Sequence, residues 1–201
     1  MQLLDSGPSP FCRKVRVLLH ETGMIGDVEV VSVTDGPLAP DEQNKAKNPL
    51  GKIPTLIRAD GPAIYDSRVI CRYLDTLAGA GLYPERTLWE TLTLEATGDG
   101  IMDAAVLMVY EGRFRDEALR SAPWVEAQWG KVAGALDALE GRWMSHLHGS
   151  LDAGQIAIGC ALGYLDLRHG DRGWRASRPA LAAWFQKFAA RPSMEATAPV
   201  A

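Results

Sequence analysis

The sequence predicts two units of different fold class, an α/β unit at the N-terminus followed by an all-helical unit. Strand-like and helix-like patterns alternate up to about residue 80, whereas from residue 85 onward apolar residues recur only at helical spacing. A short stretch with two glycines and a proline, residues 79–84, separates the two patterns. We therefore expect one domain at residues 1–80 and a second at residues 85–201.

The composition is that of an ordinary globular protein. The 201 residues are 47% hydrophobic and 23% charged, and their formal net charge is −4. Because no basic tract is present, we expect neither nucleic acid nor a membrane as a partner. We also expect no signal peptide and no membrane span, and three scattered cysteines favour a reducing compartment over a disulfide framework or a zinc site. The expected location is cytoplasmic.

The first residues predict a strand that leads into an amphipathic helix. Residues 1–5 form the expected strand, and apolar residues from Phe11 to Leu19 recur at helical spacing. Pro10 suits the first helical position, where no backbone donor is lost. Ser9 then lies at the strand-to-helix turn. Its hydroxyl either caps the helix, which contributes about 1 kcal/mol, or faces an anion that the helix N-terminus favours.

The remaining elements of the first unit follow from β-branched runs, turn residues and caps. We expect strands at residues 28–33 and 53–57, a short helix at 41–47 between them, a hairpin turn at Asp60–Gly61 and a returning strand at 63–65. Asp66 and Ser67 then cap a helix whose predicted apolar face is Val69, Ile70, Tyr73, Leu74 and Leu77. The order βαβ followed by ββα is that of a thioredoxin-like fold.

The second unit contains helical patterns only. We expect helices at residues 89–110, 125–143, 152–167 and 179–190. Asp152 and Gln155 have the spacing of a capping box at the start of the third of these helices. That helix is apolar almost all round, which predicts a buried, central position.

Lys52, Ile53 and Pro54 form a motif in which a proline opens an apparent central strand. Proline cannot donate to a strand ladder, so its presence there favours a cis Ile53–Pro54 bond. Such a bond would leave the Ile53 amide and carbonyl free to pair with a peptide-like ligand. The alternative is an edge-strand proline without a ligand, since only about one X-Pro bond in twenty is cis.

Asp66 and Ser67 have a second interpretation besides helix capping. The Ser67 hydroxyl and the helix N-terminus can bind a carboxylate, while Asp66 accepts an ammonium group. The zwitterionic end of an amino acid would satisfy both residues at once.

These three motifs, in this order and followed by an all-helical half, resemble the cytosolic glutathione transferase family, in its serine-type, bacterial-like form. The resemblance continues in the second half, where the Asp152–Gln155 pair resembles the capping box of the family's buried helix. The ending from Trp184 to Pro199 resembles the family's C-terminal pattern. The resemblance implies a thioredoxin-like glutathione-binding domain followed by an all-helical domain.

The resemblance also implies a glutathione site whose residues are Ser9, Phe11, Lys52, Ile53, Pro54, Asp66 and Ser67. Ser9 matches the catalytic hydroxyl of serine-type classes and would donate a hydrogen bond to the glutathione sulfur. The Ile53 main chain would pair with the cysteinyl part, and Lys52 would meet the glycine carboxylate. Asp66 and Ser67 would hold the γ-glutamyl end, with Asp66 a shorter version of the glutamate found in many classes.

Cys12 is a second candidate for a catalytic role. Ser9 and Cys12 have the spacing of a Cys-x-x-Cys redox site in which serine replaces the attacking cysteine. Cysteine-type members of the family use a cysteine near this position, so a redox role stays open beside that of a semi-buried helix residue. Leu3, Leu4 and Asp5 occupy the positions where tyrosine-type classes carry their tyrosine, which excludes that chemistry.

The second substrate is placed by the resemblance against the helix at residues 89–110, which points to Met108 and Tyr110, although both also suit a core. His146 and His148 form a close pair without a third ligand, so we expect a solvated helix end and no metal site. Glutathione is the expected co-substrate, with no further cofactor, and the resemblance implies a homodimer.

The expected function is that of a glutathione transferase, which conjugates the glutathione thiolate to electrophilic small molecules in detoxification. Two alternatives stay open. One is a non-catalytic binding or regulatory protein with the same fold. The other is a glutathione-dependent thiol-disulfide oxidoreductase that works through Cys12.

Overall fold

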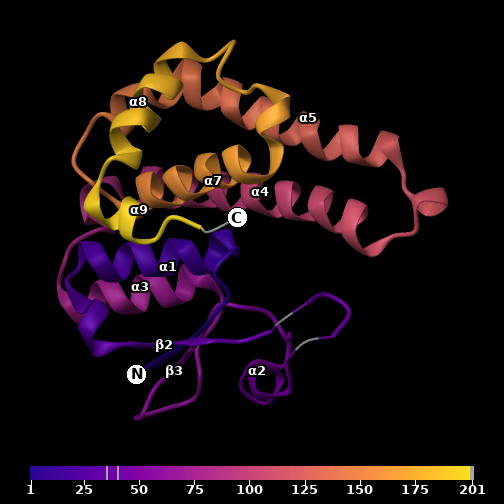
Figure 1. Cartoon of the computed structure of the whole chain (residues 1–201). Coiled ribbons are helices and arrows are strands. Elements are labelled where there is room, and N and C mark those ends of the chain that lie inside the picture. Colours follow the sequence, from indigo (N-terminus) through magenta and orange to yellow (C-terminus); the bar gives the residue numbers. More distant parts are fainter. Residues whose placement is uncertain (35, 40, 200–201) are drawn as a thin grey trace. The chain divides into compact units, whose positions relative to one another are not determined.

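The structure is a computed structural model that describes residues 1–34, 36–39 and 41–199. Its internal contacts divide the chain into two compact units (Figure 1). The first is Met1–Leu88 together with the C-terminal segment that starts at Pro192, and the second is Trp89–Arg191. Each unit is described by itself.

The first unit is built on a small mixed sheet. Its elements are β1 (Gln2–Asp5), α1 (Pro10–Glu21), η1 (Met24–Asp27), β2 (Glu29–Ser32), α2 (Glu42–Lys47), β3 (Thr55–Ile57), α3 (Ser67–Ala78), η2 (Glu85–Thr87) and α9 (Pro192–Ala196). The strand order is β2-β1-β3, with β1 parallel to β2 and antiparallel to β3. Leu3 and Leu4 of the central strand are fully buried. This arrangement confirms the predicted thioredoxin-like fold class.

The C-terminal segment belongs to the first unit because α9 packs on α1. Arg13 is buried on α1, and its Nη2 donates to the Met194 carbonyl at 3.0 Å. Ser193 Oγ donates to the Glu21 carboxylate at the other end of α1. The chain therefore returns to its first helix after the helical unit.

The expected returning strand at residues 63–65 is reduced to one bridge. Leu56 and Ile64 exchange two backbone hydrogen bonds, at 3.0 and 2.9 Å. Pro62 has no amide to extend the ladder. Gly61 does not have the positive φ that a tight hairpin turn requires, and the Arg58 side chain instead crosses the loop, with Nε donating to the Pro62 carbonyl at 3.1 Å. The prediction of a full fourth strand was wrong for these reasons.

The helix predicted after Asp66 is α3, but its buried face differs from the predicted one. Ile70 and Leu74 are fully buried as expected, whereas Val69 and Leu77 are about half exposed, at 50% and 53%. The buried stripe continues through the polar Asp75, whose carboxylate accepts the Leu82 amide at 2.7 Å. Because Asp75 is buried, the observed buried face is turned away from Val69 and Leu77.

The second unit is helical throughout its described residues, as predicted. Its elements are α4 (Leu88–Phe114), η3 (Glu117–Leu119), α5 (Ala122–Ala138), the π-helical segment η4 (Leu139–Trp143), α6 (Met144–Leu147), α7 (Ala153–His169), η5 (Gly170–Arg172) and α8 (Pro179–Ala189). No helix among the described residues has the length and apolar character needed to cross a membrane.

Helices α4 and α7 form the centre of the second unit and run side by side in the same direction (Figure 1). Near their starts, Thr91 Oγ1 donates to Asp152 Oδ2 at 2.8 Å. Further along, Gly98 meets Ala157 so closely that a Cβ at Gly98 would lie 2.7 Å from the Ala157 carbonyl carbon. At the far end of α7, His169 Nε2 lies 3.0 Å from the Ala105 carbonyl. The C-terminal ends of both helices therefore lie at the same end of the unit.

Candidate functional site

Ser9 caps the N-terminus of α1, as the sequence predicts. Its backbone is extended, at φ −72° and ψ 122°, and Pro10 occupies the first helical turn. Ser9 Oγ accepts the Cys12 amide at 3.3 Å. A hydroxyl that accepts at a cap keeps its own proton for donation. A half-buried hydroxyl donor is thus fixed where the free amides and the helix dipole favour an anion.

The side chain of Arg16, a residue of α1, stabilises the turn that carries Ser9. Arg16 Nη2 donates to the Gly7 carbonyl at 3.1 Å, and Arg16 Nε lies 3.2 Å from Asp5 Oδ1 at the end of β1. Burial raises the pKa of Asp5, and the Arg16 charge opposes that rise. The sequence reasoning missed Arg16, because a single arginine within an amphipathic helix gives no sign of its partners.

Cys12 lies behind Ser9 and is fully buried. Burial, with a smaller contribution from the neighbouring Asp5 carboxylate, raises the pKa of its thiol to about 12, although hydrogen bonds from Ser9 and Ser6 and the Arg16 charge oppose the rise. A nucleophilic or redox-active cysteine needs an accessible thiolate. At neutral pH this thiol is protonated and covered, so the geometry fits a core residue and does not fit the redox role left open above.

Phe11 is half-buried in the first turn of α1, beside the cap residue.

The Ile53–Pro54 bond is cis, as predicted, and β3 begins at the next residue. Within the part of the chain that the structure describes, the Ile53 amide and carbonyl have no hydrogen-bond partner. Lys52 is exposed on the same loop. A main-chain donor, a main-chain acceptor and an ammonium group are therefore available here to a peptide-like ligand.

A buried polar network supports this loop, and the sequence reasoning missed it. Thr55 Oγ1 donates to Asn44 Oδ1 at 2.8 Å, and Asn48 Nδ2 donates to the Lys52 carbonyl at 2.8 Å. All three polar residues, Asn44, Asn48 and Thr55, are buried. The four-residue spacing of two asparagines across a short helix was the available signal. The network fixes the carbonyl that precedes Ile53.

Asp66 caps α3, and its Oδ1 accepts the Arg68 amide at 3.0 Å. The carboxylate also pairs with the Arg68 guanidinium, with Nη2 2.8 Å from Oδ2. Burial would raise the pKa of Asp66, but the hydrogen bonds and charge of Arg68 outweigh burial and lower it, with a further contribution from the Lys14 charge. Asp66 is therefore a carboxylate at neutral pH, already flanked by cations that the sequence reasoning missed. Ser67, next to it, is buried.

The sheet register brings the three motifs to one end of the first unit. Leu4 lies opposite Thr55, so β3 begins beside the end of β1 that leads to Ser9. Ile64 lies antiparallel to Leu56, so the chain enters α3 alongside the start of β3. One edge of the first unit therefore carries Ser9, the Lys52–Pro54 loop and the Asp66–Ser67 pair, although these residues lie far apart in the sequence.

The two residues expected to contact a second substrate lie on α4 of the other unit. Met108 is buried, so its side chain belongs to the packed face of the helix. Tyr110 is half-buried, and its ring meets Phe114 edge-on with 5.3 Å between ring centroids. Of the pair, Tyr110 has the greater exposure.

His146 is not the solvated helix end that we expected. Its side chain is 18% exposed, and its Nε2 lies 2.6 Å from Asp152 Oδ2. Asp152 Oδ1 accepts the Gln155 amide at 2.9 Å, which confirms the predicted cap of α7. His148 is exposed, and within the described ranges its ring bonds only the Met144 carbonyl. Among the described residues no three histidine, cysteine or acidic side chains are placed to hold a metal ion.

Comparisons with known proteins match both halves of the chain. Residues 8–77 match the family profile described as glutathione S-transferase, N-terminal domain, and residues 122–187 match that of the C-terminal domain. In sequence the chain is 33% identical to YibF, an uncharacterized GST-like protein of Escherichia coli (strain K12), over 99% of this chain and 98% of the other.

Solved structures are similar over the full length. A glutathione transferase family member from Pseudomonas fluorescens Pf-5, crystallised with bound glutathione, is 44% identical with a TM-score of 0.97, over 100% of this chain and 99% of the other. A family member from the same organism with bound S-(propanoic acid)-glutathione is 42% identical with a TM-score of 0.92, over 100% of both chains.

Proposed function

Because this chain belongs to the glutathione S-transferase family, we propose that it binds glutathione and conjugates the glutathione thiolate to electrophilic small molecules. The observation that carries the proposal is the Ser9 hydroxyl at the N-terminus of α1. It lies on the same edge of the first unit as the Lys52–Pro54 loop and the start of α3.

Each part of glutathione has a chemical counterpart on that edge. The Ile53 amide and carbonyl suit the main chain of the cysteinyl residue, and the exposed Lys52 ammonium suits the glycine carboxylate. The Asp66 carboxylate suits the α-ammonium group of the γ-glutamyl end. Ser67 and the N-terminus of α3 suit its α-carboxylate. Phe11 and Pro54 complete the proposed set of contacts.

The proposed reaction needs a thiolate in neutral solution. Ser9 Oγ donates a hydrogen bond to the sulfur, and the helix N-terminus lowers the thiol pKa below its ordinary value of about 8.5. The thiol proton passes to solvent. The sulfur lone pair then forms the S–C bond, while the leaving group departs with the electron pair of the bond that breaks. The protein supplies position and electrostatic stabilisation.

Conjugation is favoured over the two alternatives by separate observations. The S-(propanoic acid)-glutathione held by one relative is a thioether, the kind of product that conjugation forms. The fully buried Cys12 thiol disfavours a disulfide-exchange role. A non-catalytic binding protein would hold glutathione without accelerating its reaction.

In this proposal residues 1–80 bind glutathione and residues 85–201 bind the second substrate, through Tyr110 and Met108.

Family resemblance further supports a homodimer that acts in cytoplasmic detoxification. Leu50, Val69 and Leu77 leave apolar surface exposed on the first unit, which a second copy would cover. Sedimentation at micromolar concentration should give the mass of two chains, and a single-chain mass would count against the homodimer.

The test of the proposed function combines binding with catalysis. Titration calorimetry measures glutathione affinity, and the rate of thioether formation with 1-chloro-2,4-dinitrobenzene measures conjugation above the uncatalysed rate. We expect both binding and acceleration. Binding without acceleration would support the non-catalytic alternative, and the absence of both would refute the proposal.

A further inference from the structure

Arg16 joins the three parts of the strand, turn and helix segment that carries Ser9. It lies on α1, about two turns after Ser9. Its Nη2 donates to the Gly7 carbonyl in the turn at 3.1 Å, and its Nε lies 3.2 Å from Asp5 Oδ1 at the end of β1. One guanidinium group therefore links the strand and the turn to the helix whose N-terminus Ser9 caps.

The ion pair between Asp5 and Arg16 is largely covered. The two side chains are 6% and 17% exposed. Among the described residues, Arg16 Nε and Asp5 Oδ1 have no hydrogen-bond partner, so the attraction between the two charges is what compensates for their burial. Asp5 is itself fixed in the sheet, where its carbonyl accepts the Val33 amide at 2.9 Å. Arg16 is thus attached to a rigid part of the first unit.

The turn that Arg16 contacts faces solvent. The Ser9 amide donates to the Ser6 carbonyl at 2.9 Å, which closes a turn whose two central residues, Gly7 and Pro8, are exposed. A Cβ placed on Gly7 would meet no atom within 4 Å, so this side of the turn is open. Without Arg16, the Gly7 carbonyl would bond water in place of the protein. The position of the turn therefore depends on the Arg16 side chain.

The direction of Ser9 Oγ depends in turn on where the turn lies. The Cys12 amide donates to Ser9 Oγ at 3.3 Å, whereas an N–H···O bond usually measures about 2.9–3.0 Å. Because a long cap bond holds the hydroxyl weakly, the placement of the Ser9 backbone decides where the hydroxyl proton points. Catalysis is sensitive to such placement, since a displacement of about 1 Å can cost about a hundred-fold in rate.

We propose that Arg16 is a positioning residue for thiol activation, which holds the turn so that Ser9 Oγ donates to the glutathione sulfur. This inference rests on the function proposed above and adds to it a residue that touches no substrate. The Asp5 carboxylate balances the guanidinium charge, so Arg16 acts through the position of Ser9. No bond forms or breaks at Arg16, and the thiol proton passes to solvent as described above.

The test separates the state of the bound thiol from turnover. The ultraviolet absorbance of the thiolate, titrated against pH in the complex of protein and glutathione, gives the pKa of the bound thiol without an electrophile. Steady-state conjugation of 1-chloro-2,4-dinitrobenzene gives kcat and the KM for glutathione. The variants are Arg16→Gln, Ser9→Ala and the two combined. Arg16→Lys is added because it keeps a positive charge opposite Asp5.

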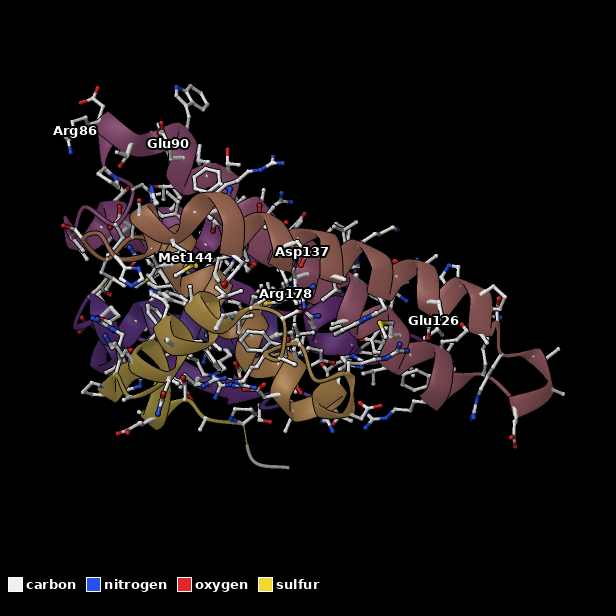
Figure 2. All side chains as sticks on the ribbon, turned by 90° about the horizontal axis from the view of Figure 1, so that it is seen from above. Arg86, Glu90, Glu126, Asp137, Met144 and Arg178 are labelled. Atoms are coloured by element: carbon white, nitrogen blue, oxygen red, sulfur yellow. The ribbon has the colours of Figure 1, made fainter. Side chains whose placement is uncertain are left out.

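Arg178→Gln is the matched control for the loss of a covered arginine. In the second unit, buried Arg178 also joins a carboxylate and a main-chain carbonyl. Its Nη2 lies 2.7 Å from Asp137 Oδ1, and its Nη1 donates to the Trp174 carbonyl at 3.0 Å (Figure 2). We expect this variant to unfold at a lower denaturant concentration and to leave the pKa of the bound thiol and kcat unchanged.

We expect Arg16→Gln to lower kcat by about ten-fold, with little change in the KM for glutathione. The pKa of the bound thiol should rise, as it should in Ser9→Ala. Adding Arg16→Gln to Ser9→Ala should change neither quantity further, because two residues that act on one interaction are not additive. Arg16→Lys should give a smaller change in the same direction, because one ammonium group cannot occupy the positions of both Nε and Nη2.

A folded Arg16→Gln with the wild-type thiol pKa and kcat would overturn the inference, and Arg16→Lys decides in the same way if the glutamine variant does not fold. A further rise of the thiol pKa when Arg16→Gln is added to Ser9→Ala would also overturn it, because the charge would then act on the sulfur directly. Neither result touches the proposed function if the wild type accelerates conjugation. A wild type that binds glutathione without acceleration and without a lowered thiol pKa would refute both.

Discussion

The Cys12 amide donates to Ser9 Oγ at 3.3 Å, while the thiol of the same cysteine is fully buried. The two residues that compete for the catalytic role in the sequence therefore have different environments. The serine hydroxyl lies at the helix N-terminus, where an anion is stabilised. The cysteine thiol lies in the core, where burial raises its pKa to about 12.

We expect Cys12→Ala to leave conjugation nearly intact and to lower stability, by about 1 kcal/mol for the small cavity it creates. All three cysteines are buried, so a thiol reagent such as DTNB should react with none of them in the native protein and with three after denaturation. One cysteine that reacts rapidly in the native state, or glutathione found as a mixed disulfide with Cys12, would contradict this expectation.

We expect Asp66→Asn to weaken glutathione binding by about ten-fold, because it removes the charge proposed to hold the γ-glutamyl ammonium group. The lowered pKa of Asp66 keeps the carboxylate ionised down to its ordinary value of 3.8 and below, so wild-type affinity should not fall between about pH 7 and pH 5. Titration calorimetry measures both effects. Asp60→Asn, which changes an exposed carboxylate in the preceding loop, is the control and should bind normally.

We expect Thr55→Val to destabilise the first unit by about 1–3 kcal/mol, because Asn44 Oδ1 would lose a buried hydrogen-bond donor. The Lys52–Pro54 loop would also be less firmly held, so the KM for glutathione should rise more than kcat falls. Denaturant unfolding and steady-state kinetics measure these changes. Thr93→Val removes an exposed hydroxyl on α4 and should change neither quantity appreciably.

We expect Gly98→Ala to destabilise the second unit by about 1–3 kcal/mol, because the new Cβ would overlap the Ala157 backbone and push α4 from α7. Gly100→Ala, two residues further along the same helix, meets nothing within 4 Å and should stabilise by up to about 1 kcal/mol through helix propensity. Thermal unfolding of the two variants should therefore shift in opposite directions. Equal shifts would mean that α4 and α7 are not packed backbone to backbone.

Local signals in the sequence predicted the parts of the structure that depend on neighbours along the chain. The Ser9 cap, the Asp66 cap and the Asp152 cap all follow from short polar residues placed before a helical pattern. The cis bond before Pro54 follows from a proline at the start of a strand. These features need no knowledge of tertiary packing.

Features that depend on tertiary partners could not be predicted in the same way. The buried side of α3 includes Asp75 because the Leu82 amide returns to it. His146 is largely covered because Asp152 binds it. The ion pair between Arg68 and Asp66 is likewise visible only once the start of α3 is folded.

The measurement that tests the central claim most directly is the pH dependence of conjugation by Ser9→Ala, with glutathione affinity determined on the same protein. The account predicts that kcat/KM falls by about ten- to a thousand-fold, the span for losing one preorganised donor. It also predicts that the apparent pKa of the bound thiol rises toward about 8.5 and that affinity changes little. Full activity with an unshifted pH profile would contradict the assignment of thiol activation to Ser9.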